Sequence, residues 1–149
     1  MGFFDRFKAK DNSGSHNESN SNQRQGRENH QMGQIVWEHL LRQDEFDSVL
    51  GESHDRPVLI FKHSTRCIIS TMVLRSLEAQ ADRLNPLGAW HYLDLIAHRD
   101  YSNLIAQELG INHESPQLII LHLGEVIWHD SHQGITPEAV MGALSTAQD

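Results

Sequence analysis

The most regular hydrophobic pattern in the chain is a run of apolar residues spaced three or four positions apart. It is formed by Ile69, Val73, Leu77, Ala81 and Leu84. This spacing places the apolar side chains on one face of a helix. The pattern stops at Asn85-Pro86, as expected because proline cannot continue a helix. The sequence therefore predicts an amphipathic helix of about four turns.

Short runs of apolar, β-branched and aromatic residues are typical of buried strands. Such runs occur at residues 58–61, 90–96 and 117–123. Gly124-Glu125 then leads into a fourth run at residues 126–128. Because glycine suits the first position of a tight turn, we expect the last two runs to form an antiparallel hairpin.

Three further helices are indicated by spacing and by the residues at their ends. Residues 44–50 and 101–109 carry apolar side chains at helical spacing, and each segment is followed by a glycine that suits a helix C-terminus. Thr136 and Pro137 are favourable as the N-cap and the first residue of a last helix.

The elements after residue 57 follow the order βαβαββα. A strand, a helix and a second strand imply a right-handed parallel crossover. The complete order is that of the minimal thioredoxin fold, an α/β architecture with a mixed four-stranded sheet flanked by helices. We therefore predict a thioredoxin-like domain over residues 35–149.

The first 34 residues differ in composition from the rest. Between Lys8 and Gln31 the only apolar side chain is Ala9, so this stretch cannot bury enough surface to offset its ordering entropy. We expect residues 1–34 to be a disordered extension. Phe3, Phe4 and Phe7 could form one apolar face of a short helical turn, although a frayed terminus is the simpler interpretation.

Charge and hydropathy narrow the possible partners. The chain of 149 residues has 12 Lys and Arg against 20 Asp and Glu, which gives a formal net charge of -8. This balance argues against nucleic acid as a partner. We find no apolar run of about 18 residues and no signal peptide pattern, so we expect no membrane span and a cytoplasmic location.

The chain contains one cysteine, Cys67, and eleven histidines. A single cysteine excludes an internal disulfide, a two-cysteine redox motif and a cysteine-only zinc or iron-sulfur site. The histidines lack a metalloprotease spacing. We expect no bound cofactor and no metal, although a metal site across the hairpin, using His122 and His129, remains an alternative.

Cys67 lies between the first predicted strand and the long helix. Its sulfur is therefore expected near unpaired backbone N–H groups and the positive end of the helix dipole, which favour thiolate over thiol. The hydroxyl groups of Thr65 and Ser70 can add to this stabilisation. A stabilised thiolate also leaves readily from a mixed disulfide. We predict that Cys67, Ser70 and Thr65 are catalytic, the alternative being a buried structural cysteine.

Further residues are expected to bind the substrate. Lys62, His63 and Arg66 are close to Cys67 in sequence and would make its surroundings electropositive. Ser115-Pro116 precedes the third strand, where a proline in this fold is commonly cis and lies opposite the cysteine. The backbone before it is then free to pair with a bound substrate.

Three segments of the chain resemble the monothiol bacilliredoxins of the YtxJ type. They are Ile60-Phe61-Lys62-His63-Ser64-Thr65-Arg66-Cys67-Ile68-Ile69-Ser70, Glu114-Ser115-Pro116-Gln117 and Val126-Ile127-Trp128-His129-Asp130-Ser131-His132. The likeness runs from about Trp37 to the C-terminus. Many members carry proline directly after the cysteine, where this chain has Ile68, and the loss of proline should loosen that turn slightly.

The resemblance implies a thioredoxin-like fold and an enzyme that reduces mixed disulfides between bacillithiol and protein cysteines. Cys67 matches the active cysteine of the family, and Ser70 matches the serine that closes its motif. The expected partners are S-thiolated client proteins and a low-molecular-weight thiol, bacillithiol, as co-substrate. A non-catalytic protein-binding module with a redox-responsive cysteine remains the alternative function.

Overall fold

The computed structural model describes residues 33–147 of the chain. The elements are β1 (Trp37–His39), α3 (Phe46–Glu52), β2 (Val58–His63), α4 (Ile68–Glu78), α5 (Ala81–Leu84), β3 (Ala89–Asp94), α6 (Arg99–Leu109), β4 (Gln117–His122), β5 (Glu125–Ser131) and α7 (Pro137–Ala147), with 3-10 turns η1 (Gln43–Glu45), η2 (Asn85–Leu87) and η3 (His132–Gly134). Residues 1–32 of the predicted N-terminal extension, including its three phenylalanines, lie outside the described residues.

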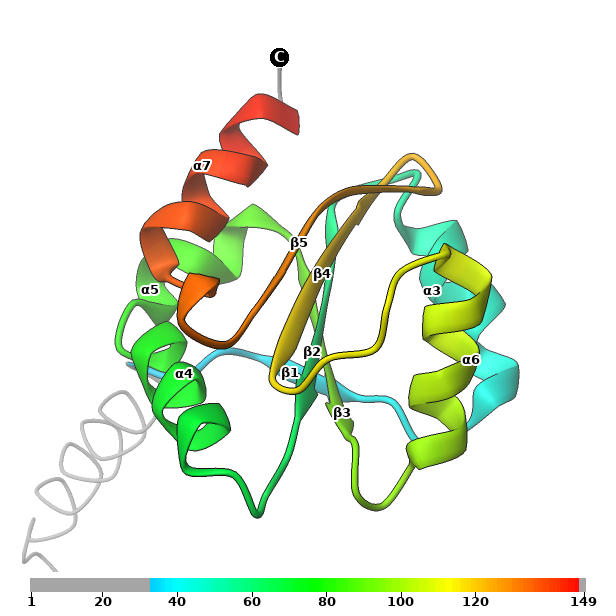
Figure 1. Cartoon of the computed structure of the whole chain (residues 1–149). Helices are drawn as coiled ribbons and strands as arrows, with labels where there is room; N and C mark the ends of the chain where they lie inside the picture. The colour runs from blue at the N-terminus through cyan, green and yellow to red at the C-terminus, as the bar shows by residue number, and fades with distance from the viewer. Residues whose placement is uncertain (1–32, 148–149) are drawn as a thin grey trace, which may run out of the picture. The chain divides into compact units, whose positions relative to one another are not determined.

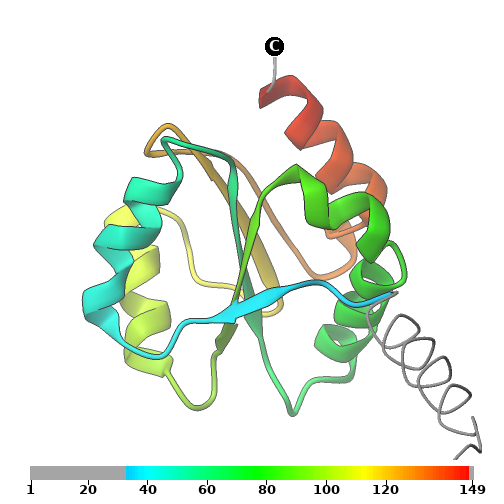
Figure 2. The ribbon, with the colours of Figure 1, turned by 180° about the vertical axis from the view of Figure 1, so that it is seen from behind.

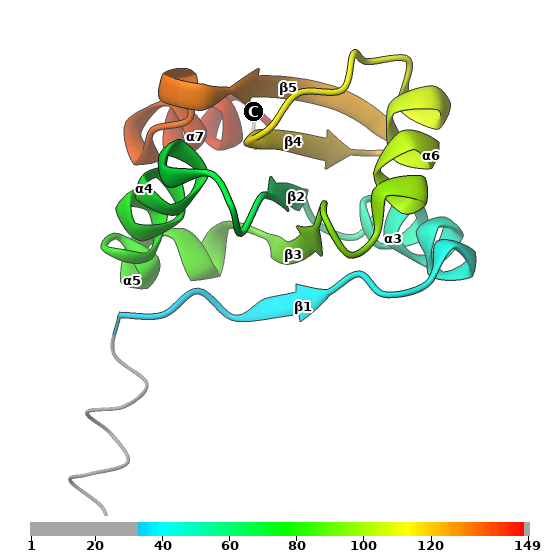
Figure 3. The ribbon, with the colours of Figure 1, turned by 60° about the horizontal axis from the view of Figure 1, so that its bottom comes forward.

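The strands form one mixed sheet in the order β1-β3-β2-β4-β5. β1 and β2 are both parallel to β3, whereas β4 is antiparallel to β2 and to β5. Figure 3 shows β1 at one edge of the sheet and β5 at the other. The predicted order βαβαββα is confirmed, but the prediction of four strands is wrong because β1 adds a fifth.

Helices cover both faces of the sheet, as Figures 1 and 2 show. The alternation of side chains along β2 divides its residues between two cores. Leu59 and Phe61 pack with residues of α4, α5 and α7, and we call this group the α4-side core. Val58 and Ile60 pack with residues of α3 and α6, which form the α6-side core. All six residues of β2 are buried.

The boundaries of several elements differ from the predicted ones. The long helix predicted over residues 69–84 is divided, because Ala79 and Gln80 separate α4 from α5. The hairpin turn lies one residue earlier than predicted: Leu123 and Gly124 both have positive φ, at 53° and 79°. Two such residues are typical of the type I′ turn, whose twist matches that of the adjoining strands.

Two predicted helix ends are confirmed in detail. Gly110 follows α6 in the left-handed conformation, with φ of 66°, which glycine adopts without the steric cost of a side chain. Thr136 precedes α7, and its Oγ1 accepts a hydrogen bond of 3.1 Å from the N–H of Ala139. This is the contact expected of an N-cap threonine.

A matched pair of glycine substitutions tests the packing at the start of β3. A Cβ atom at Gly88 would lie 2.6 Å from the carbonyl oxygen of Pro57 and 2.7 Å from a methyl group of Leu59. Because backbone cannot give way cheaply, we expect Gly88→Ala to destabilise the fold by about 1–3 kcal/mol. Gly142, within α7, has open space, so Gly142→Ala should stabilise by about 0.5–1 kcal/mol. Urea unfolding of both variants measures these changes in the free energy of unfolding. Equal changes in the two variants would contradict the predicted clash at Gly88.

Candidate active site

Cys67 lies in the segment between β2 and α4. Figure 1 shows that this connection leaves the sheet on the side where the parallel strands β2 and β3 both end. Cys67 is the N-cap residue of α4, with extended backbone dihedrals of -105° and 121°. Its N–H donates a hydrogen bond of 3.1 Å to the carbonyl oxygen of Ser64, and its own carbonyl accepts one of 3.1 Å from the N–H of Thr71. The backbone on both sides of the cysteine is therefore fixed.

The first turn of α4 provides the electrostatic environment of the sulfur. The first N–H groups of a helix have no partner within the helix, and they carry the positive end of its dipole. No side-chain hydrogen bond from the N-cap residue satisfies these groups. Cys67 itself is half-buried. A thiolate at this position therefore has backbone donors available at the helix start.

A pocket of about 180 Å³ surrounds Cys67. It is lined by Thr65, Arg66, Cys67, Ile68, Thr71, Met72 and Arg75. Two of these residues, Arg66 and Arg75, are exposed cations. Ile68 and Met72 are unusually exposed for apolar side chains, at 78% and 64%. The pocket thus offers a thiol, two guanidinium groups and an apolar rim to an approaching molecule.

Ser70 is fully buried in the first turn of α4. Its Oγ accepts a hydrogen bond of 3.1 Å from the N–H of Ser64 and lies 2.7 Å from Nδ1 of His63. Ser70 therefore connects the end of β2 to α4. The sequence suggested that this hydroxyl points at the sulfur, but in the structure its hydrogen-bond partners are His63 and Ser64.

His63 packs in the α4-side layer beside aromatic rings. Its ring centroid lies 5.8 Å from that of Phe61 and 5.5 Å from that of Tyr92. Burial lowers the pKa of His63 below 6.5, although the carboxylates of Asp94 and Glu78 act in the opposite direction. The ring is therefore neutral at pH 7. The N–H of Ser64 can only donate, so Nδ1 is the one acceptor among the partners of the buried Ser70 hydroxyl; the hydroxyl therefore donates to Nδ1, and the ring proton lies on Nε2.

Lys62 points to the opposite face of the sheet from His63. It is fully buried, and its Nζ donates a hydrogen bond of 3.1 Å to the carbonyl oxygen of Ser102 in α6. Burial lowers its pKa from 10.5 to about 8. Nζ also lies 3.5 Å from Nδ1 of His113. The hydrogen bond from Lys62 therefore attaches the end of β2 to α6.

The predicted group of three cations around the sulfur needs correction. Only Arg66 of the three lines the pocket of Cys67. Lys62 is buried on the other face of the sheet, and His63 is buried and neutral, so neither is presented to a substrate. The error arose because neighbours in a strand point to opposite faces.

The peptide bond between Ser115 and Pro116 is cis, as predicted. Gln117, the next residue, pairs with Lys62 at the end of β2, which places Pro116 at the same edge of the sheet as Cys67. The carbonyl oxygen of Pro116 accepts a hydrogen bond of 3.1 Å from the N–H of His132 in η3. Oγ of Ser115 is buried and has no hydrogen-bond partner among the described residues.

Sequence reasoning missed three residues of the cysteine pocket, Thr71, Met72 and Arg75. Thr71 and Arg75 follow Cys67 by four and eight positions. Residues at this spacing lie on one face of a helix, so the signal was present in the sequence. The second cation near the sulfur is Arg75, in place of the predicted Lys62 and His63.

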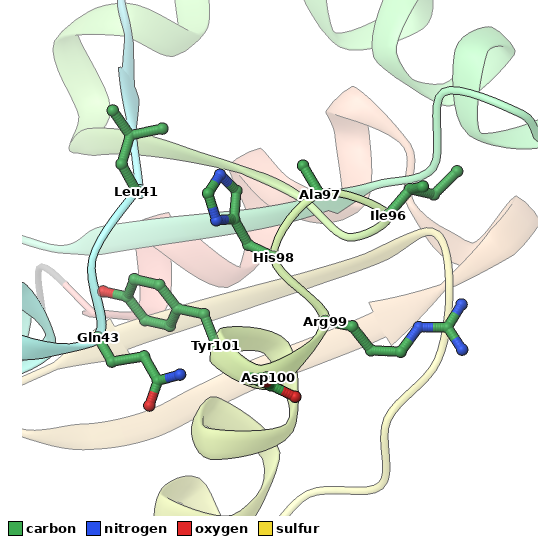
Figure 4. Close-up of a pocket in the computed structure, with 8 residues that line it drawn as sticks. All are labelled: Leu41, Gln43, Ile96, Ala97, His98, Arg99, Asp100 and Tyr101. Atoms are coloured by element: carbon green, nitrogen blue, oxygen red, sulfur yellow. The ribbon is translucent and has the colours of Figure 1, made fainter.

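A larger pocket, of about 360 Å³, lies at the start of α6. Figure 4 shows the residues that line it: Leu41, Gln43, Ile96, Ala97, His98, Arg99, Asp100 and Tyr101. Cys67 is not among them. The pocket adjoins the carboxyl end of β3, which is the neighbour of β2 at this edge of the sheet.

Two further points from the sequence are the alternative metal site across the hairpin and the expectation that no segment spans a membrane. His122 pairs with Glu125 and His129 pairs with Ile119, so the hairpin does not place the two histidines opposite each other. Among residues 33–147, no helix is long and apolar enough to cross a membrane.

Comparison with known proteins agrees with the geometry. A family model described as "Monothiol bacilliredoxin BrxC" matches residues 38–140. A solved structure described as a proposed oxidoreductase with a thioredoxin fold is 29% identical and covers 72% of this chain and 93% of its own, with a TM-score of 0.63. These similarities confirm the predicted thioredoxin-like fold and indicate thiol redox chemistry.

More distant thioredoxins share the fold alone. Thioredoxin f from spinach chloroplast, in its short form, is 19% identical and covers 78% of this chain and 96% of its own, with a TM-score of 0.58. Thioredoxin from Trypanosoma brucei brucei is 17% identical and covers 78% of this chain and 94% of its own, with a TM-score of 0.59.

The hydrogen bond between Ser70 and His63 can be tested by a double-mutant cycle. We expect Ser70→Ala to destabilise the fold by about 1–3 kcal/mol, because it leaves buried polar groups of His63 and Ser64 unpaired. His63→Phe keeps a ring but removes the acceptor, so the double variant should lose less than the sum of the single variants. Urea unfolding of the four proteins gives the coupling. Ser76→Ala, at an exposed position of α4, serves as the control. If the losses of stability in Ser70→Ala and His63→Phe add up to the loss in the double variant, the hydrogen bond between the two side chains is contradicted.

The buried ammonium of Lys62 predicts a dependence of stability on pH. With a pKa of about 8 when folded and 10.5 when unfolded, the unfolded chain binds the proton more tightly, so the wild-type protein gains stability as pH rises through this window. Lys62→Met lacks this contribution. We expect the variant to be more stable than wild type at pH 7 by at most about 3 kcal/mol, with the difference falling towards pH 10. Urea unfolding at several pH values measures the difference in stability between Lys62→Met and wild type. A difference that does not change with pH would contradict the lowered pKa of Lys62.

Proposed function

Because the chain belongs to the monothiol bacilliredoxin family, we propose that it removes bacillithiol from S-thiolated proteins through a mixed disulfide on Cys67. The observation that carries this proposal is the position of Cys67. It is the only cysteine of the chain, it caps the start of α4, and it opens into a pocket that also contains Arg66 and Arg75.

The proposed reaction consists of two thiol-disulfide exchanges. In the first, the Cys67 thiolate attacks the bacillithiol sulfur of the client's mixed disulfide. The bond between that sulfur and the client sulfur breaks, and the client leaves as a thiolate that takes up a proton. In the second, another bacillithiol thiolate attacks the bacillithiol sulfur bound to Cys67. Oxidised bacillithiol forms, and Cys67 leaves as a thiolate.

The residues around Cys67 have distinct parts in this proposal. The N–H groups at the start of α4 stabilise the thiolate as attacking and as leaving group, and the exposed Thr65 lies on the same pocket rim. Arg66 and Arg75 bind carboxylates of the small thiol. Ser115 and Pro116, at the same sheet edge, shape the surface that receives the client.

Ser70 has an indirect part in the proposal. Its hydrogen bonds to His63 and Ser64 hold the loop that precedes the cysteine. It therefore fixes where α4 starts relative to β2, and with it the position of the sulfur. A chain with one cysteine and no disulfide framework suits the cytoplasm, where thiols are kept reduced, and we propose that the exchange takes place there.

A second candidate function is a protein-binding module in which Cys67 only responds to redox conditions. The exposed Ile68, Ile69 and Met72 beside the cysteine favour it, because exposed apolar side chains that cluster mark protein contact sites. The two functions differ in turnover: a binding module takes up the small thiol once and does not transfer it repeatedly.

We expect Cys67→Ser to abolish removal of bacillithiol from an S-thiolated client while leaving the fold intact, since serine is close in size. Intact-mass measurement after incubation with oxidised bacillithiol should show one adduct on the wild-type chain and none on the variant. Incubation with oxidised glutathione, run separately, identifies the preferred small thiol.

A matched control separates catalysis from simple thiol reactivity. The double variant Cys67→Ser with Ser145→Cys carries one thiol at an exposed position of α7. It should form an adduct but not turn over. Turnover by this control equal to that of wild type, or activity retained in Cys67→Ser, would overturn the proposed mechanism. An adduct on wild type without turnover would favour the binding module.

A further inference from the structure

A second cluster of reactive side chains lies on the sheet face opposite to α4. Glu38 of β1 pairs directly with His91 of β3 in the parallel register, so both side chains point to the α3 side. Glu52, in the last turn of α3, meets them there. One potential ligand atom from each of the three lies within 4.8 Å of the others. They line a pocket of about 160 Å³ together with Glu45 and Ser48.

The imidazole of His91 has one engaged and one free nitrogen. The ring is almost fully buried, with a side-chain exposure of 4%, and Nε2 lies 2.9 Å from Oε2 of Glu52. Nδ1 is buried and has no hydrogen-bond partner among the described residues. Because a carboxylate only accepts, Nε2 carries the proton, so the neutral tautomer that fits this contact has its lone pair on Nδ1. A buried lone pair without a donor is costly and points to a ligand.

The nearest group to this lone pair is the carboxylate of Glu38. Its Oε2 lies 3.8 Å from Nδ1, which is too far for a hydrogen bond. A nitrogen and an oxygen bound to one tetrahedral zinc ion lie about 3.4 Å apart, given metal-ligand distances of about 2.0–2.2 Å. The Glu38 side chain is 63% exposed and is free to move by a few tenths of an ångström.

The role of Glu52 follows from its contacts. Its Oε1 accepts a hydrogen bond of 2.9 Å from Arg56, which leaves Oε2 directed at His91. A histidine that binds a metal usually donates its other N–H to a carboxylate, which fixes the tautomer and orients the ring. The pair of His91 and Glu52 already has this arrangement. Two carboxylates next to one imidazole also supply the negative charge that a divalent cation requires.

We propose that His91 and Glu38 bind a divalent transition metal ion such as Zn²⁺, through Nδ1 and the carboxylate, with Glu52 orienting the imidazole through Nε2. Water completes the coordination on the solvent side. The site is independent of Cys67, and it differs from both sequence expectations, the absence of a metal and the hairpin pair His122 and His129. Imidazole favours transition metals over Mg²⁺.

Calorimetric titration with Zn²⁺ tests the site in the full chain carrying Cys67→Ser, which removes the thiol as a competing ligand. We expect one ion per chain, with binding unaffected by excess Mg²⁺. Glu38→Gln should weaken Zn²⁺ binding at least about tenfold, and Glu52→Gln about 10–100-fold, the range found for partners of a ligating histidine. The controls Glu138→Gln and His122→Gln, outside the cluster, should bind like the parent chain.

Nuclear magnetic resonance of the imidazole nitrogens tests His91 without substituting a buried residue. Zn²⁺ should shift Nδ1 of His91 and leave Nε2 protonated. Three results would each overturn the site: no binding of Zn²⁺ at sub-millimolar concentration, binding that Glu38→Gln and Glu52→Gln leave unchanged, or binding with no change at Nδ1 of His91.

Discussion

The hydrogen bonds from Ser64 to Ser70 and from Ser70 to His63 join the central strand to the helix that begins at the cysteine. β2 pairs with β3 on one side and β4 on the other, so its position in the sheet is fixed. The start of α4 is not fixed by the sheet. The buried hydroxyl of Ser70 makes two short hydrogen bonds, and these hold the first turn of α4 against the end of β2. They therefore also determine where the cysteine at the start of α4 lies.

The polar residues at the end of β2 form hydrogen bonds with helices on both faces of the sheet. A polar side chain inside a core is tolerated when it has hydrogen-bond partners. His63 meets Ser70 of α4, whereas Lys62 meets the backbone of α6. The two residues are neighbours in sequence and act on opposite faces because strand side chains alternate. The chain leaves the sheet at this point and forms the loop before Cys67, so the loop starts from an end anchored on both sides.

Local patterns predicted most of the fold and the centre of the site. The strand at 58–61, the glycine after α6, the threonine before α7 and the position of Cys67 at a helix start depend on neighbouring residues, so one sequence was enough. β1 was missed because it has only three residues, of which Glu38 and His39 are polar and exposed. It is a strand because it pairs with the outer side of β3, and this long-range pairing has no local sequence signal. The group formed by Glu38, Glu52 and His91 depends on that same pairing and on α3, and no local spacing indicates it.

Ile68 shows how the site tolerates a change in its sequence motif. Proline at the first position of a helix presets φ, but it has no N–H. Ile68 occupies this position in α4 and is 78% exposed, so the chain loses some preorganisation and keeps one more backbone donor next to the sulfur. The loop gains order instead from the hydrogen bond between Cys67 N–H and Ser64 and from the buried hydroxyl of Ser70. Because these contacts lie in the loop before α4 and in its first turn, they position the start of the helix without proline, and the isoleucine side chain stays exposed at the rim of the cysteine pocket.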